Sequence, residues 1–300
     1  KGLMPLFSTA VRHVALHCKT PSREVNTKIE DAFVAIYQKA GLDINDPTTT
    51  WHGSFSFNLQ TTYNHEDYAS NPFHLLLICV SFFALLAIKE LRRSKELLAY
   101  AAIICGSFLL FCLVLKWQIW HPRLHLPMFV LAMPFCALVF SKLRFGLAVK
   151  SLVAVTVLYG FVFVFDNDSR KLLENKNNIF TASRMEQYFV TRRNLKEPYR
   201  TVAELLKEKE LSRLGLVLGG DSWEYPLWQL LKDTKKLRIE HIDVKNKTSQ
   251  AKGQAVFRDF LPEAIMTSKW ELAEKDSYTF DGKNYHSVYQ RENINLFVTE

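Results

Sequence analysis

The sequence predicts an α-helical polytopic membrane protein with four spans, followed by a C-terminal α/β domain. Four apolar segments follow one another between residues 73 and 165, and short basic segments separate them. Residues 167–300 have the mixed composition of a soluble domain, with strand and helix patterns in alternation. We therefore expect three parts: a loop region over residues 1–72, a four-span region over residues 73–166, and an α/β domain over residues 167–300.

The loop region begins with two predicted helices. Residues 3–17 place apolar side chains at helical spacing, with Arg12, His13 and His17 off the apolar face. This helix either lies on a membrane surface or packs against protein. Residues 20–41 predict a second helix that ends at a glycine. A turn-rich, aromatic stretch then leads to the first apolar segment.

The apolar segments are close to the length of about 20 residues that crosses a bilayer, although the first and third are short. Asn71-Pro72 suits the start of the first helix. The alternative is a set of core helices in a soluble protein, but four such segments in succession are unusual in a soluble core. The predicted spans are Phe73–Ile88, Leu97–Leu115, Leu124–Phe140 and Phe145–Phe165.

Lys and Arg in the short connections predict the orientation, because these residues are enriched in cytoplasmic loops. Residues 89–96 and residues 141–146 are both basic, and both lie on the cytoplasmic side if the spans alternate. The second connection, residues 116–125, then faces outward. The loop region and the C-terminal α/β domain are therefore predicted to be extracytoplasmic.

The C-terminal part alternates between helix and strand patterns. Residues 201–211 predict a helix, and residues 213–232 predict a buried strand, a Gly-Gly turn and a second helix. Gly219-Gly220-Asp221 has neither the GxGxxG spacing nor a P-loop, so a turn in which Asp221 or Ser222 caps the next helix is favoured over a nucleotide site. Further strand candidates are residues 238–244, 263–268, 285–290 and 294–300.

Composition excludes some classes of function. The formal net charge of +8 invites a nucleic-acid partner, but several basic residues lie in short loops where topology explains them. The sequence has no zinc-finger, RNP-like or helix-turn-helix pattern, so we expect no nucleic-acid binding. Of the five cysteines, four lie in apolar segments and one stands alone, which does not form a disulfide framework.

His65, Glu66 and Asp67 form a cluster of ionisable groups just before the first predicted span. Three adjacent side chains cannot all point the same way, so they do not form a complete metal site by themselves. The cluster could help to hold a divalent ion, contact a sugar hydroxyl or act as a general base. Alternatively it is a solvated loop in which Asp67 or Asn71 caps the following helix.

The second connection carries an unusual density of basic and imidazole groups for a loop that faces outward. These candidate binding residues are Lys116, His121, Arg123 and His125. A cationic pocket of this kind would suit a phosphate or pyrophosphate, because Arg supplies a planar fork of donors. Contact with lipid headgroups is the alternative. Pro127 and Pro134 interrupt the following span, which is tolerated where a helix is packed or lines a cavity.

Three stretches carry a resemblance to a known family. HEDYASNPFHLLL enters the first span, WHPRLHLPMFVLAMP opens the third, and DSWEYPLWQLL lies in the α/β domain. Together they resemble the later half of polytopic GT-C glycosyltransferases, in particular the bacterial dolichyl-phosphate-mannose-mannosyltransferase and aminoarabinose-transferase-like group. Arg123-Leu124-His125-Leu126-Pro127 stands at the place of the family's aromatic-Arg-Tyr-x-x-Pro type motif, with His125 where Tyr is commoner.

The resemblance implies transfer of a sugar from a polyprenyl-phosphate donor to a lipid or glycan acceptor outside a bacterial inner membrane. Arg123, with Lys116 or His125, would hold the lipid phosphate, and His65 and Glu66 would face the same cavity. The family's catalytic carboxylates precede this part of the chain, so no catalytic residue is assigned. No set of ligand residues in the sequence requires a cofactor, and the binding of a divalent cation stays an open alternative.

Two other functions stay open. One is a non-catalytic membrane anchor that presents the α/β domain to a binding partner. The other is a lipid-linked glycan ligase or polymerase, which would also need outward Arg and His groups. The chain begins with Lys1, and we expect it to be the C-terminal part of a longer polypeptide.

Overall fold

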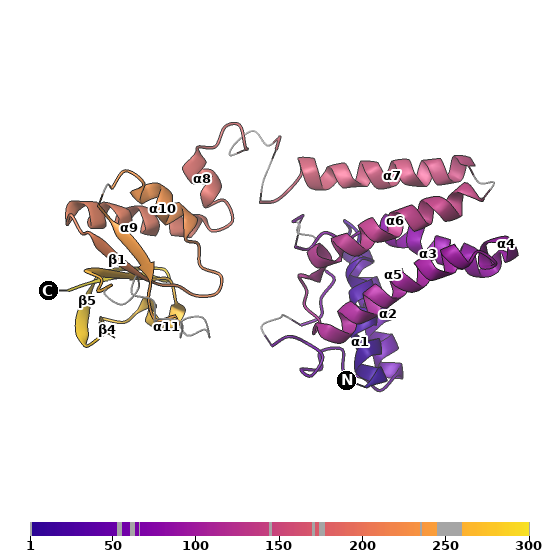
Figure 1. The fold of residues 1–300 in the computed structure, drawn as a ribbon, viewed down its shortest axis with the longest axis horizontal. Coiled ribbons are helices and arrows are strands. Elements are labelled where there is room, and N and C mark those ends of the chain that lie inside the picture. Colours follow the sequence, from indigo (N-terminus) through magenta and orange to yellow (C-terminus); the bar gives the residue numbers. More distant parts are fainter. Residues whose placement is uncertain are drawn as a thin grey trace. The chain divides into compact units, whose positions relative to one another are not determined.

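The computed structural model describes residues 2–52, 56–60, 64–65, 67–143, 146–169, 172–173, 178–234, 236–244 and 260–299. The chain divides into two compact units, residues 1–173 (the first unit) and residues 174–300 (the second unit). Figure 1 shows that the first unit is helical, whereas the second unit contains a sheet with helices.

The first unit consists of helices and connecting loops. In chain order the elements are α1 (Leu3–Leu16), α2 (Arg23–Lys39), α3 (Pro72–Ala87), α4 (Lys89–Arg92), α5 (Lys95–Val114), the 3-10 helix η1 (His121–His125), α6 (Leu126–Ser141) and α7 (Gly146–Phe165). Local signals account for several ends. The hydroxyls of Ser22 and Ser94 accept from backbone N–H groups in the first turns of α2 and α5. Gly41, with φ +65°, follows the end of α2.

Three helices of the described residues are long and apolar enough to cross a membrane: Lys95–Val114, His121–Ser141 and Gly146–Phe165. The first predicted span, Phe73–Ile88, is not among them, because its helix α3 has 16 residues and the chain becomes extended at Ile88. At 1.5 Å per residue, such a helix is roughly 24 Å long, shorter than a hydrocarbon core of about 30 Å.

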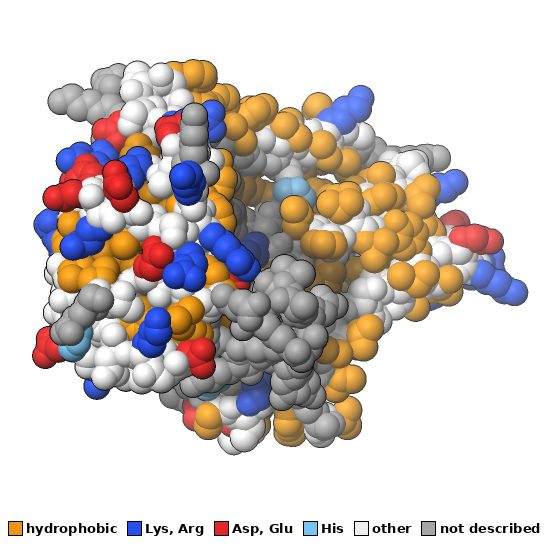
Figure 2. Space-filling view, turned by 60° about the vertical axis from the view of Figure 1, so that its left-hand side comes forward, with side chains coloured by type: hydrophobic (Ala, Val, Ile, Leu, Met, Phe, Trp, Pro, Cys, Tyr) orange, Lys and Arg blue, Asp and Glu red, His pale blue; other side chains and the backbone are white. Residues whose placement is uncertain are grey.

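The apolar helices expose much of their hydrophobic surface. Figure 2 shows hydrophobic side chains covering helices of the first unit, whereas Lys, Arg, Asp and Glu are spread over the visible face of the second unit. On α7, for example, Leu158 is 64% exposed and Val157 is 56% exposed. Apolar patches of this size mark a membrane or a partner surface. These helices are consistent with a membrane protein.

The apolar helices also share an interior. Helices α3, α5 and α6 pack around small and aromatic side chains, among them Ala101, Ala132 and Phe135. The small residues allow close approach of the helices. Pro134 lies inside α6, as predicted, whereas Pro127 lies in the first turn of α6 and does not interrupt the helix. The Tyr100 hydroxyl of α5 donates to Leu131 O at 2.9 Å.

The second unit is built on a six-stranded mixed sheet with strand order β2-β1-β3-β6-β5-β4. β1 runs parallel to β2 and β3, whereas β6, β5 and β4 continue the sheet in antiparallel fashion. The elements are α8 (Arg184–Tyr188), η2 (Arg193–Leu195), α9 (Lys196–Glu208), β1 (Arg213–Val217), α10 (Tyr225–Leu231), β2 (Arg238–His241), β3 (Ala264–Thr267), α11 (Trp270–Ala273), β4 (Ser277–Phe280), β5 (Lys283–Arg291) and β6 (Ile294–Val298).

The sheet has an apolar core on each face. Leu214 and Leu216 of β1 pack with α9 and α10 on one face, whereas Val217 points to the other face with Ile265. This alternation follows from the two-residue period of a strand. The prediction of a C-terminal domain with strands and helices is thus confirmed at this level, while β4 was not among the predicted strands.

The Gly-Gly turn after β1 differs in detail from the prediction. Neither Asp221 nor Ser222 caps α10, whose N-cap residue Glu224 makes no side-chain capping bond. The Ser222 hydroxyl instead accepts a hydrogen bond from Gly219 N at 2.7 Å and closes the turn itself. The prediction of a cap was wrong because the helix begins three residues later than Ser222.

Substitutions at Asn295 of β6 test the buried hydrogen bonds of the second unit. Its side chain is fully buried, Nδ2 donates to Leu272 O at 3.1 Å and to Lys275 O at 2.9 Å, and Oδ1 accepts from Ser287 Oγ at 2.8 Å. We expect Asn295→Ala to lower the free energy of unfolding by about 1–3 kcal/mol. Asn295→Asp should cost more, because a carboxylate would face carbonyl oxygens.

Chemical denaturation followed by circular dichroism measures both variants. Asn284→Asp is the matched control, because Asn284 is exposed and uses its side-chain oxygen as an acceptor for Thr279. Equal stability of Asn295→Asp and Asn295→Ala would contradict the described hydrogen bonds.

Candidate functional site

The loop region and the second connection form one assembly. Ala15 and Leu16 of α1 pack with Leu59 and with Trp117 of the second connection in a small apolar core. A short parallel bridge joins Thr50 to Trp117, with Trp117 N donating to Thr49 O at 2.9 Å. The segments that the sequence predicts to be outer loops therefore fold together.

Arg12 of α1 is the charged centre of this assembly. Its side chain is 0% exposed. Nη1 donates to Ile44 O at 2.8 Å and to Thr50 Oγ1 at 2.7 Å. Nη2 donates to Thr49 Oγ1 at 2.7 Å, and the guanidinium lies 5.1 Å from the centre of the Trp117 ring. One guanidinium thus holds α1, the loop at residues 44–50 and the second connection together.

Two of the predicted site residues form an ion pair between the loop region and the second connection. Arg123 Nη1 donates to Asp67 Oδ1 at 2.6 Å, and the side chains are 54% and 23% exposed respectively. His65 Nδ1 accepts from Asp67 N at 3.1 Å and lies 3.6 Å from Asp67 Oδ2. The pair therefore sits at the surface of the first unit, with one imidazole beside it.

The structure also corrects the alternative interpretation of this loop. Asn71 occupies the N-cap position of α3, but its side chain makes no capping hydrogen bond, and Asp67 pairs with Arg123 instead of capping the helix. Glu66, the third member of the cluster, lies outside the described residues. Lys116 is exposed and donates to Pro47 O at 3.1 Å, so it lies on a backbone carbonyl.

His121 and His125 are buried, in contrast to the cationic loop surface that the sequence suggests. They meet His13 and His17 of α1 in a cluster of four imidazoles. His17 Nε2 and His125 Nδ1 share a hydrogen bond at 2.7 Å, and the His13 ring stacks on the His121 ring with centres 4.8 Å apart. The assigned tautomer decides which nitrogen donates.

The sequence contained a signal for this cluster. His13 and His17 are four residues apart on one helix, and His121 and His125 are also four residues apart. In an α-helix, residues at this spacing lie on the same face, so His13 and His17 present two imidazoles in one direction. His121 and His125 lie in a 3-10 helix, where this rule does not apply. The sequence predicts that His13 and His17 lie off the apolar face of their helix, and in the structure both side chains are buried.

Burial disfavours the charged form of both imidazoles of α1. Burial, followed by the charge of neighbouring His125, holds the pKa of His13 and of His17 well below its usual value. Both ring nitrogens of His13, together with His17 Nδ1, His121 Nδ1 and His125 Nε2, find no hydrogen-bond partner among the described residues. The described part of the chain has no group of three or more His, Cys, Asp or Glu side chains that could hold a metal ion.

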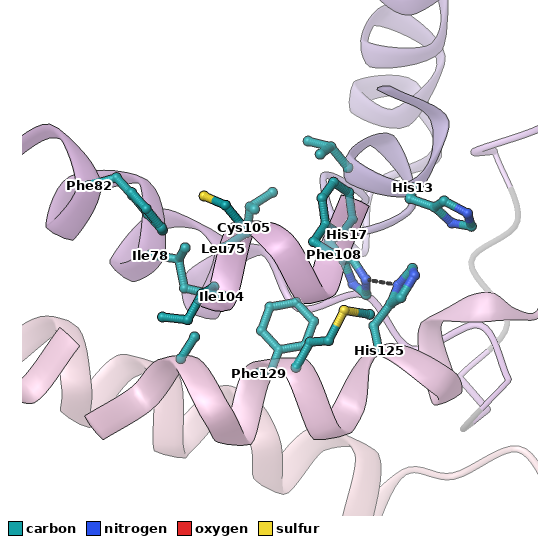
Figure 3. Close-up of a pocket in the computed structure, with 13 residues that line it drawn as sticks. His13, His17, Leu75, Ile78, Phe82, Ile104, Cys105, Phe108, His125 and Phe129 are labelled. Atoms are coloured by element: carbon teal, nitrogen blue, oxygen red, sulfur yellow. Dashed lines mark hydrogen bonds between the residues drawn. The ribbon is translucent and has the colours of Figure 1, made fainter. Parts of the chain in front are cut away.

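An apolar cavity of about 200 Å³ adjoins the histidine cluster. Figure 3 shows the hydrogen-bonded His17 and His125 at one end of it and Phe82 at the other. Side chains of α1, α3, α5 and α6 line it, among them Ile104 and Phe129. The cavity therefore has an apolar body and an end with hydrogen-bonding groups, a combination that suits an amphipathic ligand.

Lys19, which the sequence analysis did not single out, is a second buried cation of the loop region. Its side chain is 4% exposed, and the described residues offer its ammonium no hydrogen-bond acceptor or carboxylate. Its nitrogen lies 5.7 Å from the centre of the Tyr68 ring. Burial lowers the pKa of Lys19 to about 8.

This pKa predicts a pH dependence of stability. Since the folded pKa of about 8 is below the ordinary value of 10.5, the folded state binds the proton less tightly than the unfolded state. The penalty on folding, about 3 kcal/mol from the size of the shift, is complete below pH 8 and disappears as the pH rises towards 10.5. Lys19→Met should therefore be more stable than wild type at pH 7, with a difference that shrinks above pH 8.

Thermal denaturation in non-ionic detergent, at intervals from pH 6 to about 10.5, measures this difference. Lys39→Met is the control, because Lys39 is an exposed cation at the end of α2. If the difference in stability between wild type and Lys19→Met were the same at every pH, the lowered pKa of Lys19 would be contradicted.

Comparison of the chain with models of protein families, with curated protein sequences and with solved structures finds no match. The features of the first unit that bear on function are therefore the ion pair, the histidine cluster and the apolar cavity beside it.

Proposed function

We propose that this protein is a membrane glycosyltransferase that moves a sugar from a polyprenyl-phosphate donor to an extracytoplasmic lipid or glycan acceptor. The observation that carries the proposal is the position of η1, at the start of α6. This short helix directs His125 to an apolar cavity and Arg123 to a half-exposed ion pair with Asp67. One element thus connects an apolar site with a cationic group.

A polyprenyl-phosphate sugar has parts that match these features. The isoprenoid chain is apolar and would lie against the cavity between α1, α3, α5 and α6. The phosphate would meet Arg123, whose planar fork of donors suits phosphate oxygens. Since the Arg123 side chain is 54% exposed, a phosphate can reach it without unfolding the loop.

The chemistry assigned to Arg123 is stabilisation of the leaving group. In the transfer, the bond between the sugar C1 and the phosphate oxygen breaks, and the acceptor oxygen forms the new bond to C1. Negative charge then grows on the polyprenyl phosphate, and a fixed guanidinium stabilises it. Asp67 orients that guanidinium through the bond at 2.6 Å. The base that removes the acceptor proton is not assigned to a described residue.

The proposal includes a topology of four spans, with α3 as the first. Flanking residues would extend α3 across the bilayer, and a local thinning of the bilayer would reduce the mismatch. The basic connections at residues 89–96 and 141–146 would face the cytoplasm of a bacterium. The loop region and the second unit would then lie outside, on the side where the acceptor is.

Cysteine labelling tests this topology. In a chain whose five native cysteines are replaced by alanine, Lys116→Cys should react with a membrane-impermeant maleimide on intact cells, because residue 116 is exposed in an outward connection. Arg93→Cys, also at an exposed position, should react only after the membrane is permeabilised. The reverse pattern, or reaction of both cysteines on intact cells, would contradict the proposed orientation.

Variants of the ion pair test the function. In membranes that contain the full-length protein, Arg123→Ala should lower the rate of transfer from a polyprenyl-phosphate sugar by about 10²–10³-fold, the usual effect of losing one stabilising donor. Arg123→Lys should recover part of this loss, and Asp67→Asn should cost less than Arg123→Ala. Glu66→Ala is measured beside them.

Lys39→Ala is the matched control, because it removes an exposed cation of the same unit that is distant in sequence from η1. Wild-type transfer by Arg123→Ala and Glu66→Ala would remove these residues from the site. Absence of any transfer by the wild-type protein would favour the anchor or ligase alternatives.

A further inference from the structure

The first unit has a second cavity, and its lining differs chemically from that of the proposed donor site. It is formed where the turn between α1 and α2, the loop at residues 64–70 and the C-terminal part of α7 meet. Its volume of about 140 Å³ is enough for several water molecules or for a group of similar size. Polar and charged groups line much of it, in contrast to the cavity beside the histidines.

The buried residue Lys19 determines which ligands suit this cavity. Lys19 lines the cavity, and the described residues provide no counter-ion for it. A buried charge without a partner is costly, and proteins keep such a group where something neutralises it. The face of the Tyr68 ring, 5.7 Å from the nitrogen, supplies part of the compensation. An anion in the cavity would supply the rest.

The walls of the cavity are held in place by hydrogen bonds. Ser70 Oγ donates to Lys19 O at 3.0 Å and lies 3.3 Å from the Tyr159 hydroxyl of α7. Asn64 Nδ2 donates to the backbone oxygen of Asp166 at the end of α7. These bonds join the loop, the turn and the helix, so the cavity exists without a ligand and binding requires little rearrangement.

Asp166 restricts what the cavity can accept. It also lines the cavity, and no ion pair joins it to Lys19 among the described residues. A simple anion would be repelled by this carboxylate. A suitable ligand places its anionic oxygens towards Lys19 and presents hydroxyl groups, as hydrogen-bond donors, towards Asp166.

We propose that this cavity binds a hydroxylated anion, namely a phosphate or carboxylate group with neighbouring alcohol groups. Two sources share this chemistry: the headgroup of a phospholipid such as phosphatidylglycerol, and a soluble polyol phosphate. Tyr159 and Phe163 belong to a helix long and apolar enough to cross a membrane, so a lipid headgroup can approach from its end. The site is separate from the Arg123 ion pair and does not require glycosyl transfer.

Ligand-induced thermal stabilisation of the whole chain in non-ionic detergent tests the proposal. Glycerol 3-phosphate or phosphatidylglycerol should raise the Tm of wild type by about 3 °C or more at saturation. Glycerol and phosphatidylcholine, which lack a net negative charge, should not. A response to the lipid alone identifies a headgroup site, and a response to the soluble anion identifies a site for a free ligand.

Lys19→Met should lose this stabilisation, while Lys19→Arg and the exposed control Lys39→Met should keep it. Asp166→Asn should weaken the preference for hydroxylated anions over inorganic phosphate. The proposal is overturned if neither anion raises the Tm of wild type, or if Lys19→Met responds as wild type does. These outcomes are independent of the transfer assay, since no variant here alters Arg123 or Asp67.

Discussion

The arrangement of the first unit depends on one buried cation, the guanidinium of Arg12. A fully buried charge is stable only if its hydrogen bonds are satisfied, and Arg12 meets this condition with Thr49, Thr50 and a carbonyl oxygen at residue 44. Breaking any one of these bonds would leave a desolvated donor. The same guanidinium lies against the Trp117 ring. Since His13 follows Arg12 in α1 and His121 follows Trp117 by four residues, this contact brings the two pairs of histidines together.

The ionisable groups of the first unit fall into two environments. Asp67 and Arg123 form a partly exposed pair that water and ligands can reach. The imidazoles and Lys19 are buried, where desolvation disfavours charge. A ligand with an apolar chain and a charged group would use both environments at once, with the chain among the helices and the charge at the surface. This division is the physical basis for the proposed lipid-phosphate substrate.

Some of these features could be predicted from the sequence, and the reasons for the others are physical. Apolar length indicated the helices α5, α6 and α7, and strand periodicity indicated β1, β3 and β6. The bounds of α3 were predicted to within one residue, but its 16 residues do not by themselves show that it crosses a membrane. The burial of Arg12, Lys19 and the histidines was not predicted, since periodicity shows which side chains leave the apolar face of a helix but not what those side chains contact. The Asp67–Arg123 pair spans 56 residues, and only tertiary structure could bring it together.

The strand order of the second unit has a consequence for its biosynthesis. β6 is the last strand in the chain, yet it lies inside the sheet and joins β3 of the parallel part to β5 of the antiparallel part. Until residues 294–298 have left the ribosome, the two parts of the sheet have no strand to connect them. One edge of β3 therefore stays unpaired until then, and an unpaired strand edge favours aggregation. The sheet of this unit can therefore be completed only after β6 has been synthesised.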